Sequence, residues 1–431
     1  MKRMQHVNIV SAVRPLYYVS RVLGLGLFSF TDSFVVKEIK TLWILYTVIL
    51  LIAVLTCGVY CTVQRVGQSG LLATIVVNEF LMMFIGALKA VSSIFISVAM
   101  NGAKSRKFIS TVVKVDRSLL SDPITTYRNT FIFTLVQAVA VWSYIAILFT
   151  YDTWVWKQVA EKMSIWYLIS TYPHRIVNTD TVVQSCNLVL LLKNRLKTLN
   201  KRLGSILQES DEPYIETALL INVPYNSVFS HTENERLFSG MKRSSLMSHV
   251  ESPQTVNRLR QHTKISKKWN LYNIRKLYDD LCDISVLVNS MYGFQLLLEL
   301  GVTTMELASA LYFILAAILK IQTFERDIIG HFISLMAAWI FLISFKLISI
   351  TAPCHSATTE AENTAVLVQK LLLVPNFDHD TVAELQLFSQ QLLQCKIKFT
   401  AFGFLILDYP LLFTIIGGVT TYLVIAMQYE K

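Results

Sequence analysis

The sequence has few charged residues for its length. Only 16% of its 431 residues are Asp, Glu, Lys or Arg, whereas 53% are hydrophobic. An ordinary soluble domain has about 25% charged residues. A soluble fold of this size would need a fuller charged shell, so the composition excludes an ordinary soluble protein and indicates one that lies in a lipid bilayer.

Sequence motifs of common enzymes and metal sites are also missing. The chain has no glycine-rich phosphate loop, no Ser/His/Asp set and no HExxH pair. None of the six cysteines has zinc-site spacing or falls in a predicted outer loop, so we expect no disulfide framework. The segment 378–380 (Asp-His-Asp) is better explained by a helix start at Asp380 than by a metal site. We therefore expect no enzyme, no metal and no cofactor.

Long apolar blocks dominate the chain instead. A helix needs about 20 mostly apolar residues to cross the hydrocarbon core of a membrane. Seven segments qualify as candidates: 41–61, 71–100, 129–151, 164–192, 284–319, 329–351 and 405–429. The fourth is the least regular, because polar groups between 172 and 180 interrupt it. The prediction is an all-α membrane protein with seven transmembrane helices.

Basic residues are distributed unevenly between the two sides of this arrangement. With the N-terminus inside, the inner segments hold 31 Lys and Arg residues and the outer segments hold 6. Without the long loop 193–283 the ratio is still 16 to 6. The positive-inside rule then predicts an inverted topology, with a cytoplasmic N-terminus and an outer C-terminus. The net charge of +10 is thus mostly a topology signal, and we expect no nucleic-acid partner.

The spans predict six parts along the chain. Cytoplasmic segments begin it at 1–40 and interrupt it twice later. The first interruption, 193–283, is expected to hold helical extensions around a polar, poorly ordered insert at 209–262. The second, 352–404, is expected to hold two anchor helices separated at Pro375-Asn376. The remaining parts are helices one to four in 41–192, helices five and six in 284–351, and the last helix with a short outer tail in 405–431.

The last span has one small or polar face. Gly418, Thr421, Ile425 and Gln428 recur at three- and four-residue steps. An opposing apolar face consists of Leu412, Ile416, Val419, Leu423 and Met427. Lipid would reject a polar stripe, so the asymmetry suits a helix that lines a water-filled path. Small residues packed against another helix would give the same pattern.

The end of this span resembles the closing signature of insect gustatory receptors, which is Thr-Tyr, five hydrophobic residues and Gln-Phe. Residues 421–429 (TYLVIAMQY) match it, except that Tyr429 replaces the usual Phe. Residues 352–355 (APCH) resemble the family's Pro-Cys-His segment, and 13–18 (VRPLYY) resemble its Arg-Pro-Leu-Phe region. The resemblance implies a tastant-gated, non-selective cation channel in the plasma membrane of a sensory neuron.

The resemblance also implies an assembly and a pore. Four copies, or four related receptors in a heterotetramer, would surround one pore lined by the last helix, with membrane lipid outside. By position, Ile425 and Tyr429 would form a hydrophobic constriction with Gln428 as a polar ring beside it and Thr421 on the same face. Glu430 would follow at the outer mouth of the pore.

Polar residues within the spans are the candidates for binding a small-molecule tastant, because such groups are costly in a membrane. Carboxylates, amides and aromatic rings together suit a small polar organic ligand. The candidates are Asn78, Glu79, Tyr167, His174, Asn178, Glu299, Thr303, Glu306 and Trp339. A second interpretation stays open, in which Glu299, Glu306, Lys89 and Arg175 simply pair with one another across the bundle.

Two other classes of membrane protein remain as alternatives. A seven-helix G-protein-coupled receptor would require an outer N-terminus, and the chain lacks Asp-Arg-Tyr after the third span and Asn-Pro-x-x-Tyr in the seventh. A secondary transporter would fit the polar residues of the second, fourth and fifth spans. The sequence has no paired, repeated halves of the kind that many transporters show.

Overall fold

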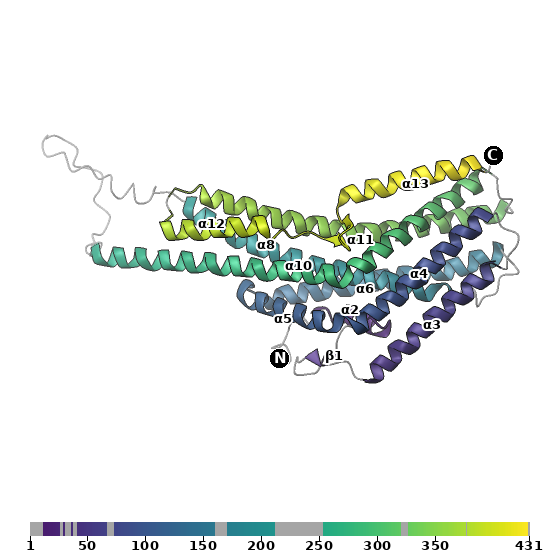
Figure 1. Ribbon diagram of the computed structural model, residues 1–431, viewed down its shortest axis with the longest axis horizontal. Coiled ribbons are helices and arrows are strands. Elements are labelled where there is room, and N and C mark those ends of the chain that lie inside the picture. Colours follow the sequence, from purple (N-terminus) through teal and green to yellow (C-terminus); the bar gives the residue numbers. More distant parts are fainter. Residues whose placement is uncertain are drawn as a thin grey trace, which may run out of the picture. The chain divides into compact units, whose positions relative to one another are not determined.

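The computed structural model is almost entirely helical (Figure 1). It describes residues 12–25, 29–30, 36–37, 41–66, 73–159, 170–211, 253–319, 326–375 and 377–429. The helices are α2 (Arg14–Val22), α3 (Thr41–Val66), α4 (Ala73–Ala99), α5 (Asn101–Leu119), α6 (Pro123–Val159), α8 (Tyr172–Asp211), α10 (Pro253–Ile318), α11 (Arg326–Leu372), α12 (His379–Gln394) and α13 (Tyr409–Tyr429). The prediction of a helical protein is confirmed.

Two short strand pairs accompany the helices. Strand β1 (Ser29–Phe30) pairs antiparallel with β2 (Val36–Lys37). Strand β3 (Thr400–Ala401) pairs antiparallel with β4 (Leu405–Ile406), and this hairpin leads directly into α13. The predicted start of the last span at residue 405 is therefore wrong, because residues 405–406 form a strand and the helix begins at Tyr409.

Within the described residues, five helices are long and apolar enough to cross a membrane: Leu42–Tyr60, Pro123–Gln158, Asn270–Ile318, Ile328–Leu372 and Tyr409–Gln428. A sixth candidate is a helix pair, Met82–Ser97 and Asn101–Leu119, that bends by 63° at its break. These correspond to six of the seven predicted spans. The described part of the remaining one is α8, a continuous helix that is too polar to meet the same measure.

The polar stretch between 172 and 180 does not break α8. Pro173 lies in the first turn of the helix, where a missing amide N–H costs nothing. The predicted poorly ordered insert, 209–262, is wrong at both ends, because α8 continues to Asp211 and α10 begins at Pro253. Residues 212–252 of that insert lie outside the described residues.

The inner helices also differ from the prediction in detail. α11 runs without a break through Pro353, so the sixth span and the first anchor helix are one element. α12 begins at His379, and the Asp378 carboxylate accepts a hydrogen bond from the Thr381 hydroxyl at 2.6 Å. Asp378 therefore stands before the first turn, where Asp380 had been expected.

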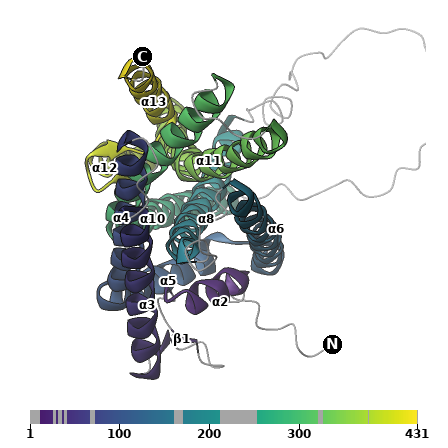
Figure 2. The ribbon, with the colours of Figure 1, turned by 90° about the vertical axis from the view of Figure 1, so that its right-hand side faces the viewer.

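The described chain divides into two compact units. The first contains 1–198, 277–362 and 395–431, and the second contains 199–276 and 363–394. Within the first unit, α3 and α4 lie side by side, and α2 packs on α6 (Figures 1 and 2). α3 buries little of its surface: Leu42, Leu45 and Ile49 are among its large exposed apolar side chains. Such a surface suits membrane lipid.

The main apolar core of the first unit gathers side chains from α6, α10 and α11. Phe332 and Leu335 of α11 are fully buried in it, and Trp339 and Leu342 continue the same cluster along that helix. Ala426 of α13 belongs to this core as well. α13 therefore packs directly against the helices that carry the polar groups described below.

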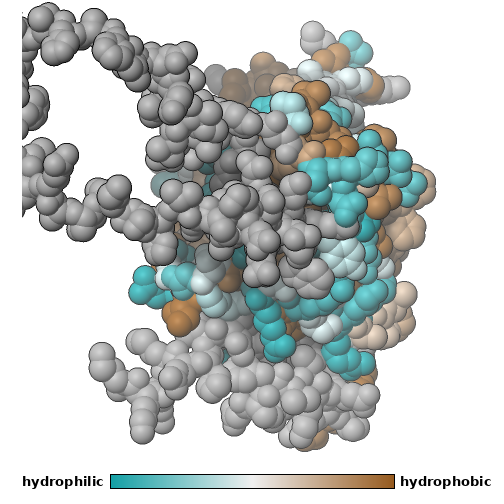
Figure 3. Space-filling view, turned by 90° about the vertical axis from the view of Figure 1, so that its left-hand side faces the viewer, coloured by the Kyte–Doolittle hydropathy of each residue, from teal (hydrophilic) through white to brown (hydrophobic). Residues whose placement is uncertain are grey.

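The second unit is more polar. Arg275 of α10 forms an ion pair with Glu384 of α12 at 3.3 Å. The Thr364 hydroxyl donates a hydrogen bond to Asn200 at 2.6 Å. Figure 3 shows one face of the molecule on which hydrophilic side chains gather among scattered hydrophobic ones. That face differs from the apolar surface of α3 and suits contact with water.

Candidate functional site

A chain of buried charges joins five helices of the first unit. The Lys89 ammonium of α4 forms an ion pair with Glu299 of α10 and donates to the Asn178 carbonyl of α8 at 3.2 Å. Lys346 of α11 lies 3.0 Å from both Glu299 and Glu306. The interpretation in which these charges pair across the bundle is thus confirmed for the Lys89–Glu299 contact.

The chain continues toward a more open side through Arg175. Its guanidinium is 3.4 Å from Glu306 and lies over the Trp339 ring, 4.3 Å from the ring centroid. The Trp339 indole N–H donates to Asp152 at 2.9 Å, and the Tyr172 hydroxyl donates to the other oxygen of Asp152 at 3.0 Å. Arg175 keeps 22% of its side chain exposed, so it is the least buried charge of the network.

The network is balanced in charge. Its cations are Lys89, Lys346 and Arg175, and its carboxylates are Glu299, Glu306 and Asp152. Unpaired charges in a low-dielectric interior are very costly, whereas paired and hydrogen-bonded ones are tolerated. The pairing explains how six ionisable groups can lie inside an apolar bundle.

Sequence reasoning missed two members of this network. Lys346 had been assigned to the inner end of its span, yet only 6% of its side chain is exposed and it lies between two carboxylates. Asp152 had been placed in an outer loop, because the third span was predicted to end at residue 151. In the structure α6 extends eight residues further and includes Asp152. The signal for Lys346 was its place in an apolar run, where a lone charge needs a partner.

Of the other predicted ligand residues, some have side chains that the structure describes and the rest do not. His174 and Asn178 are buried and face Gly86 of α4: Asn178 donates to the Gly86 carbonyl at 3.1 Å, and a Cβ at Gly86 would lie 3.0 Å from the His174 ring. Thr303 is fully buried and donates to the Glu299 carbonyl of its own helix at 2.7 Å. Tyr167 and the side chains of Asn78 and Glu79 lie outside the described residues.

The last helix has one packed and one open face. Val419 and Ala426 are buried, and Leu423 and Met427 pack against the main core. Among the predicted pore residues, Thr421, Ile425 and Gln428 are exposed. Ile416, assigned to the apolar face, is also exposed, at 56%. The Tyr429 side chain and Glu430 lie outside the described residues.

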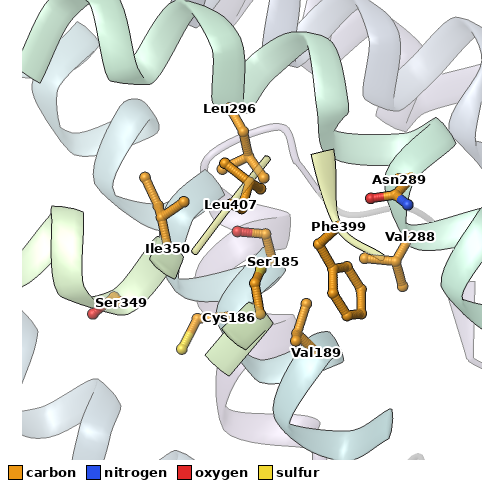
Figure 4. Close-up of a pocket in the computed structure, with 11 residues that line it drawn as sticks. Ser185, Cys186, Val189, Val288, Asn289, Leu296, Ser349, Ile350, Phe399 and Leu407 are labelled. Carbon is orange, nitrogen blue, oxygen red and sulfur yellow. The ribbon is translucent and has the colours of Figure 1, made fainter. Parts of the chain in front are cut away.

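A small cavity lies where the hairpin before α13 meets α8, α10 and α11 (Figure 4). Phe399 and Leu407 flank the hairpin there, opposite Cys186 of α8. The volume of this cavity that the centre of a water molecule can occupy is about 10 Å³. This is enough for about one water molecule, so the cavity is too small for an organic ligand.

A bundle of long apolar helices around a balanced set of buried charges defines a multi-pass membrane protein. Residues 13–431 match the family model of the 7tm chemosensory receptors, so the chain belongs to that family. The predicted resemblance to insect gustatory receptors is confirmed.

Its relatives include gustatory receptors of Drosophila melanogaster. Putative gustatory receptor 28a is 28% identical over 56% of this chain and 51% of its own length. Putative gustatory receptor 28b is 25% identical over 50% and 49%, respectively. The chain thus spans about half the length of these two curated relatives. The gustatory receptor for sugar taste 43a is 23% identical over 67% of this chain and 66% of that protein.

The fold is similar to a solved insect receptor. The structure of the olfactory receptor OR5 from Machilis hrabei superposes with a TM-score of 0.64 and 11% identity, over 97% of both chains. The structure of the same receptor in complex with eugenol gives a TM-score of 0.63 and 12% identity, also over 97% of both chains. At this identity the likeness concerns the fold.

Proposed function

We propose that this protein is a gustatory receptor that works as a tastant-gated, non-selective cation channel in the plasma membrane of a sensory neuron. It spans the membrane seven times with its N-terminus in the cytoplasm. Membership of the chemosensory receptor family supports this proposal, as do five or six helices apolar enough to cross a membrane. The fold likeness to an insect olfactory receptor supports it as well.

The fourth span is α8 together with the residues before it. It is polar, but its polar side chains point inward: Asn178, Asp180 and Gln184 are all at least 94% buried. A helix surrounded by other helices does not need an apolar surface of its own. Shielding of this kind explains how α8 crosses the bilayer despite its composition.

The tastant binds at the network of buried charges. Arg175 and Trp339 form its open end, and Glu306 lies just behind them. A small polar ligand there competes for hydrogen bonds that the charges now make with one another. We assign ligand contacts to the predicted set: Asn78, Glu79, Tyr167, His174, Asn178, Glu299, Thr303, Glu306 and Trp339.

One observation carries the link from ligand to pore, namely the double role of Trp339. Its indole N–H is bonded to Asp152 and its ring lies under Arg175, while the same side chain belongs to the core that holds Ala426 of α13. A ligand that displaces Trp339 therefore changes the packing of the last helix. Packed cores shift between discrete arrangements, so a small displacement can be transmitted.

The pore is formed by α13 from four copies, or from related receptors. The open face of α13 supports this assignment, since Gly417 and Gly418 have no neighbour near the position of a Cβ. Thr421, Ile425 and Gln428 line the pore, Tyr429 completes the constriction, and Glu430 lies at the mouth. Bulky apolar rings close a pore by dewetting, and a small rotation of the helix opens it.

The proposal is tested by expressing the chain alone in oocytes and recording currents during a screen of sugars, bitter compounds and other tastants. We expect a cation current that persists when GDPβS blocks G-protein signalling. Trp339→Phe keeps an aromatic ring, although a smaller one, and removes the N–H donor, so it should shift the tastant concentration for half-maximal current. Tyr312→Phe serves as the matched control for an aromatic side chain of the same core.

Two outcomes would overturn the proposal. A response abolished by GDPβS would indicate a G-protein-coupled receptor instead. A C-terminal epitope that antibodies reach only after permeabilisation would contradict the seven-span, inverted topology. If Tyr312→Phe shifted the tastant concentration for half-maximal current as much as Trp339→Phe, the role assigned to Trp339 would be wrong. The proposed channel function would not be affected.

A further inference from the structure

Asp180 of α8 is a buried carboxylate that lies outside the network of paired charges. Its side chain is completely buried. One carboxylate oxygen accepts a hydrogen bond from Gln184 at 3.0 Å, whereas the other has no hydrogen-bond partner. No described Lys, Arg or His forms an ion pair with it. An uncompensated carboxylate in such a place is strongly unfavourable, so its charge must be neutralised by something else.

The groups around Asp180 are polar but neutral. The Tyr292 hydroxyl of α10 donates to the Gln184 side-chain oxygen at 2.9 Å, and Tyr292 interacts electrostatically with Asp180. The Ser20 hydroxyl of α2 reaches Asp180, but it donates to the Leu16 carbonyl at 2.8 Å. Tyr292 is thus a titratable group that interacts with Asp180, and it brings no positive charge.

Two further oxygen atoms without partners belong to the same level of the bundle. The side-chain oxygens of Gln295 on α10 and Ser93 on α4 have no hydrogen-bond partner, and both residues are at least 99% buried. Buried polar atoms in folded proteins are nearly always satisfied. Three unsatisfied oxygens on three helices therefore call for a shared explanation.

Contacts on either side fix the levels of these oxygens. α8 and α10 run antiparallel, with Arg175 paired to Glu306 and Gln184 bonded to Tyr292, so Asp180 lies between these two contacts. α4 also runs antiparallel to α10: Lys89 of α4 pairs with Glu299, and Asn101, the first residue of α5 just beyond the end of α4, donates a hydrogen bond to the Met291 carbonyl.

Ser93 and Gln295 both lie between this second pair of contacts. Gln295 is three residues beyond Tyr292 and four before Glu299, on the same face of α10. Asp180, Gln295 and Ser93 therefore come from three helices at one level of the bundle. That level is about one helical turn from Glu299, on the side of Tyr292.

We propose that Asp180 is the anchor of a buried small-cation site, which holds a proton or a sodium ion together with the oxygens of Gln295 and Ser93. The chemistry common to both occupants is a compact positive charge that needs oxygen acceptors. A proton would turn one carboxylate oxygen into a donor for a neighbouring acceptor. A sodium ion would be held by the three oxygens, because hard cations prefer oxygen ligands.

The test uses purified full-length protein, so it does not depend on channel activity. Unfolding temperature is measured in NaCl and in choline chloride at equal ionic strength, at pH 6 and at pH 8. A ligand that binds only the folded state raises its stability. If sodium is the occupant, NaCl raises the unfolding temperature at pH 8. If a proton is the occupant, lowering the pH to 6 in choline chloride raises it, because the folded protein then holds a proton that the unfolded chain lacks.

Asp180→Asn removes the need for a counter-charge at nearly unchanged shape, so it should abolish whichever dependence the unsubstituted protein shows. Asp283→Asn is the matched control, since this aspartate is 61% exposed and its substitution should leave the dependence unchanged. The proposal is overturned if the unsubstituted protein shows neither dependence, or if Asp180→Asn keeps it.

A second variant guards against a failure of Asp180→Asn to fold. Gln295→Leu removes one oxygen from the site at similar size and leaves the carboxylate. It should raise the sodium concentration of half-maximal stabilisation several-fold, or shift the pH midpoint if a proton is bound. Unchanged midpoints for both would exclude Gln295 from the site and contradict the proposed arrangement.

Discussion

The ammonium of Lys346 on α11 lies 3.0 Å from a carboxylate oxygen of Glu306 on α10. The same ammonium is 3.0 Å from Glu299, so one cation holds two acids that are two turns apart on α10. Both acids also have a second cation, Lys89 for Glu299 and Arg175 for Glu306. Removing a charge in the middle of such a chain leaves its neighbours unbalanced.

Lys346→Met should therefore destabilise the protein strongly. Methionine has nearly the same length but no charge, so two buried carboxylates lose a partner. Breaking a buried ion pair from one side costs about 3–5 kcal/mol. Thermal unfolding of the detergent-solubilised protein measures the loss. Lys370→Met is the control, because Lys370 is exposed on the same helix.

The double substitution Lys346→Met with Glu306→Gln sharpens this prediction. It removes one positive and one negative charge, so the rest of the network stays balanced. The combined loss of stability should be smaller than the sum of the two single losses. Strict additivity, or a Lys346→Met variant as stable as Lys370→Met, would contradict the pairing.

The sequence was sufficient to predict the helical membrane fold, and it singled out polar residues within the spans, but it did not predict the contacts among them. Apolar length alone located the spans of α3, α6 and α13. The fourth span, which contains α8, was the least regular of the seven, since a helix shielded by its neighbours has no apolar signature of its own. Lys346 was misinterpreted for a different reason. Its charge was counted as a topology signal, although its partners Glu306 and Glu299 lie 40 and 47 residues earlier in the chain. Such contacts depend on tertiary packing, which periodicity does not encode.

A second buried ion pair gives an independent prediction on stability. The Arg195 guanidinium of α8 donates two hydrogen bonds of 2.9 Å to Asp116 of α5, and the Tyr127 hydroxyl of α6 donates to the same carboxylate at 2.7 Å. Arg195→Lys keeps the charge but cannot form the two parallel bonds. We expect a loss of about 1.5–3 kcal/mol, the value of a hydrogen bond to a charged group.

The measurement is again thermal unfolding, with Arg106→Lys as the matched control on an exposed part of α5. Tyr127→Phe removes a single bond to the same carboxylate and should cost less than Arg195→Lys. If Arg195→Lys and Arg106→Lys unfolded at the same temperature, the two-pronged contact would contribute nothing to stability.

The proposed pore face predicts a change in gating without a change in folding. Ile425 is 48% exposed, so Ile425→Ala removes bulk from the proposed constriction while leaving the packed face of α13 intact. A wider, less bulky apolar ring dewets less readily, so we expect a larger current in the absence of tastant. Val424→Ala is the control, since Val424 is 53% exposed but lies off the predicted pore face. Equal basal currents for the two variants would argue against Ile425 as the constriction.

Two glycines of α10 isolate the contact between that helix and the hairpin before α13. A Cβ at Gly293 would lie 3.0 Å from the backbone nitrogen of Phe402, whereas nothing lies within 4 Å of a Cβ at Gly301. Phe402 already has a positive φ of 53°, so its backbone has little freedom to move away. Gly→Ala within a helix by itself favours folding by about 0.5–1 kcal/mol at either position.

Gly301→Ala should therefore be neutral or slightly stabilising, and Gly293→Ala should lose about 1–3 kcal/mol through overpacking. Because both variants gain the same helix propensity, the difference between their unfolding temperatures measures the hairpin contact alone. Gly293→Ala should also change the basal current, since the hairpin leads directly into α13. Two variants with equal unfolding temperatures would mean that the hairpin can move away from α10 at no cost, and the start of the last helix would then be free of that constraint.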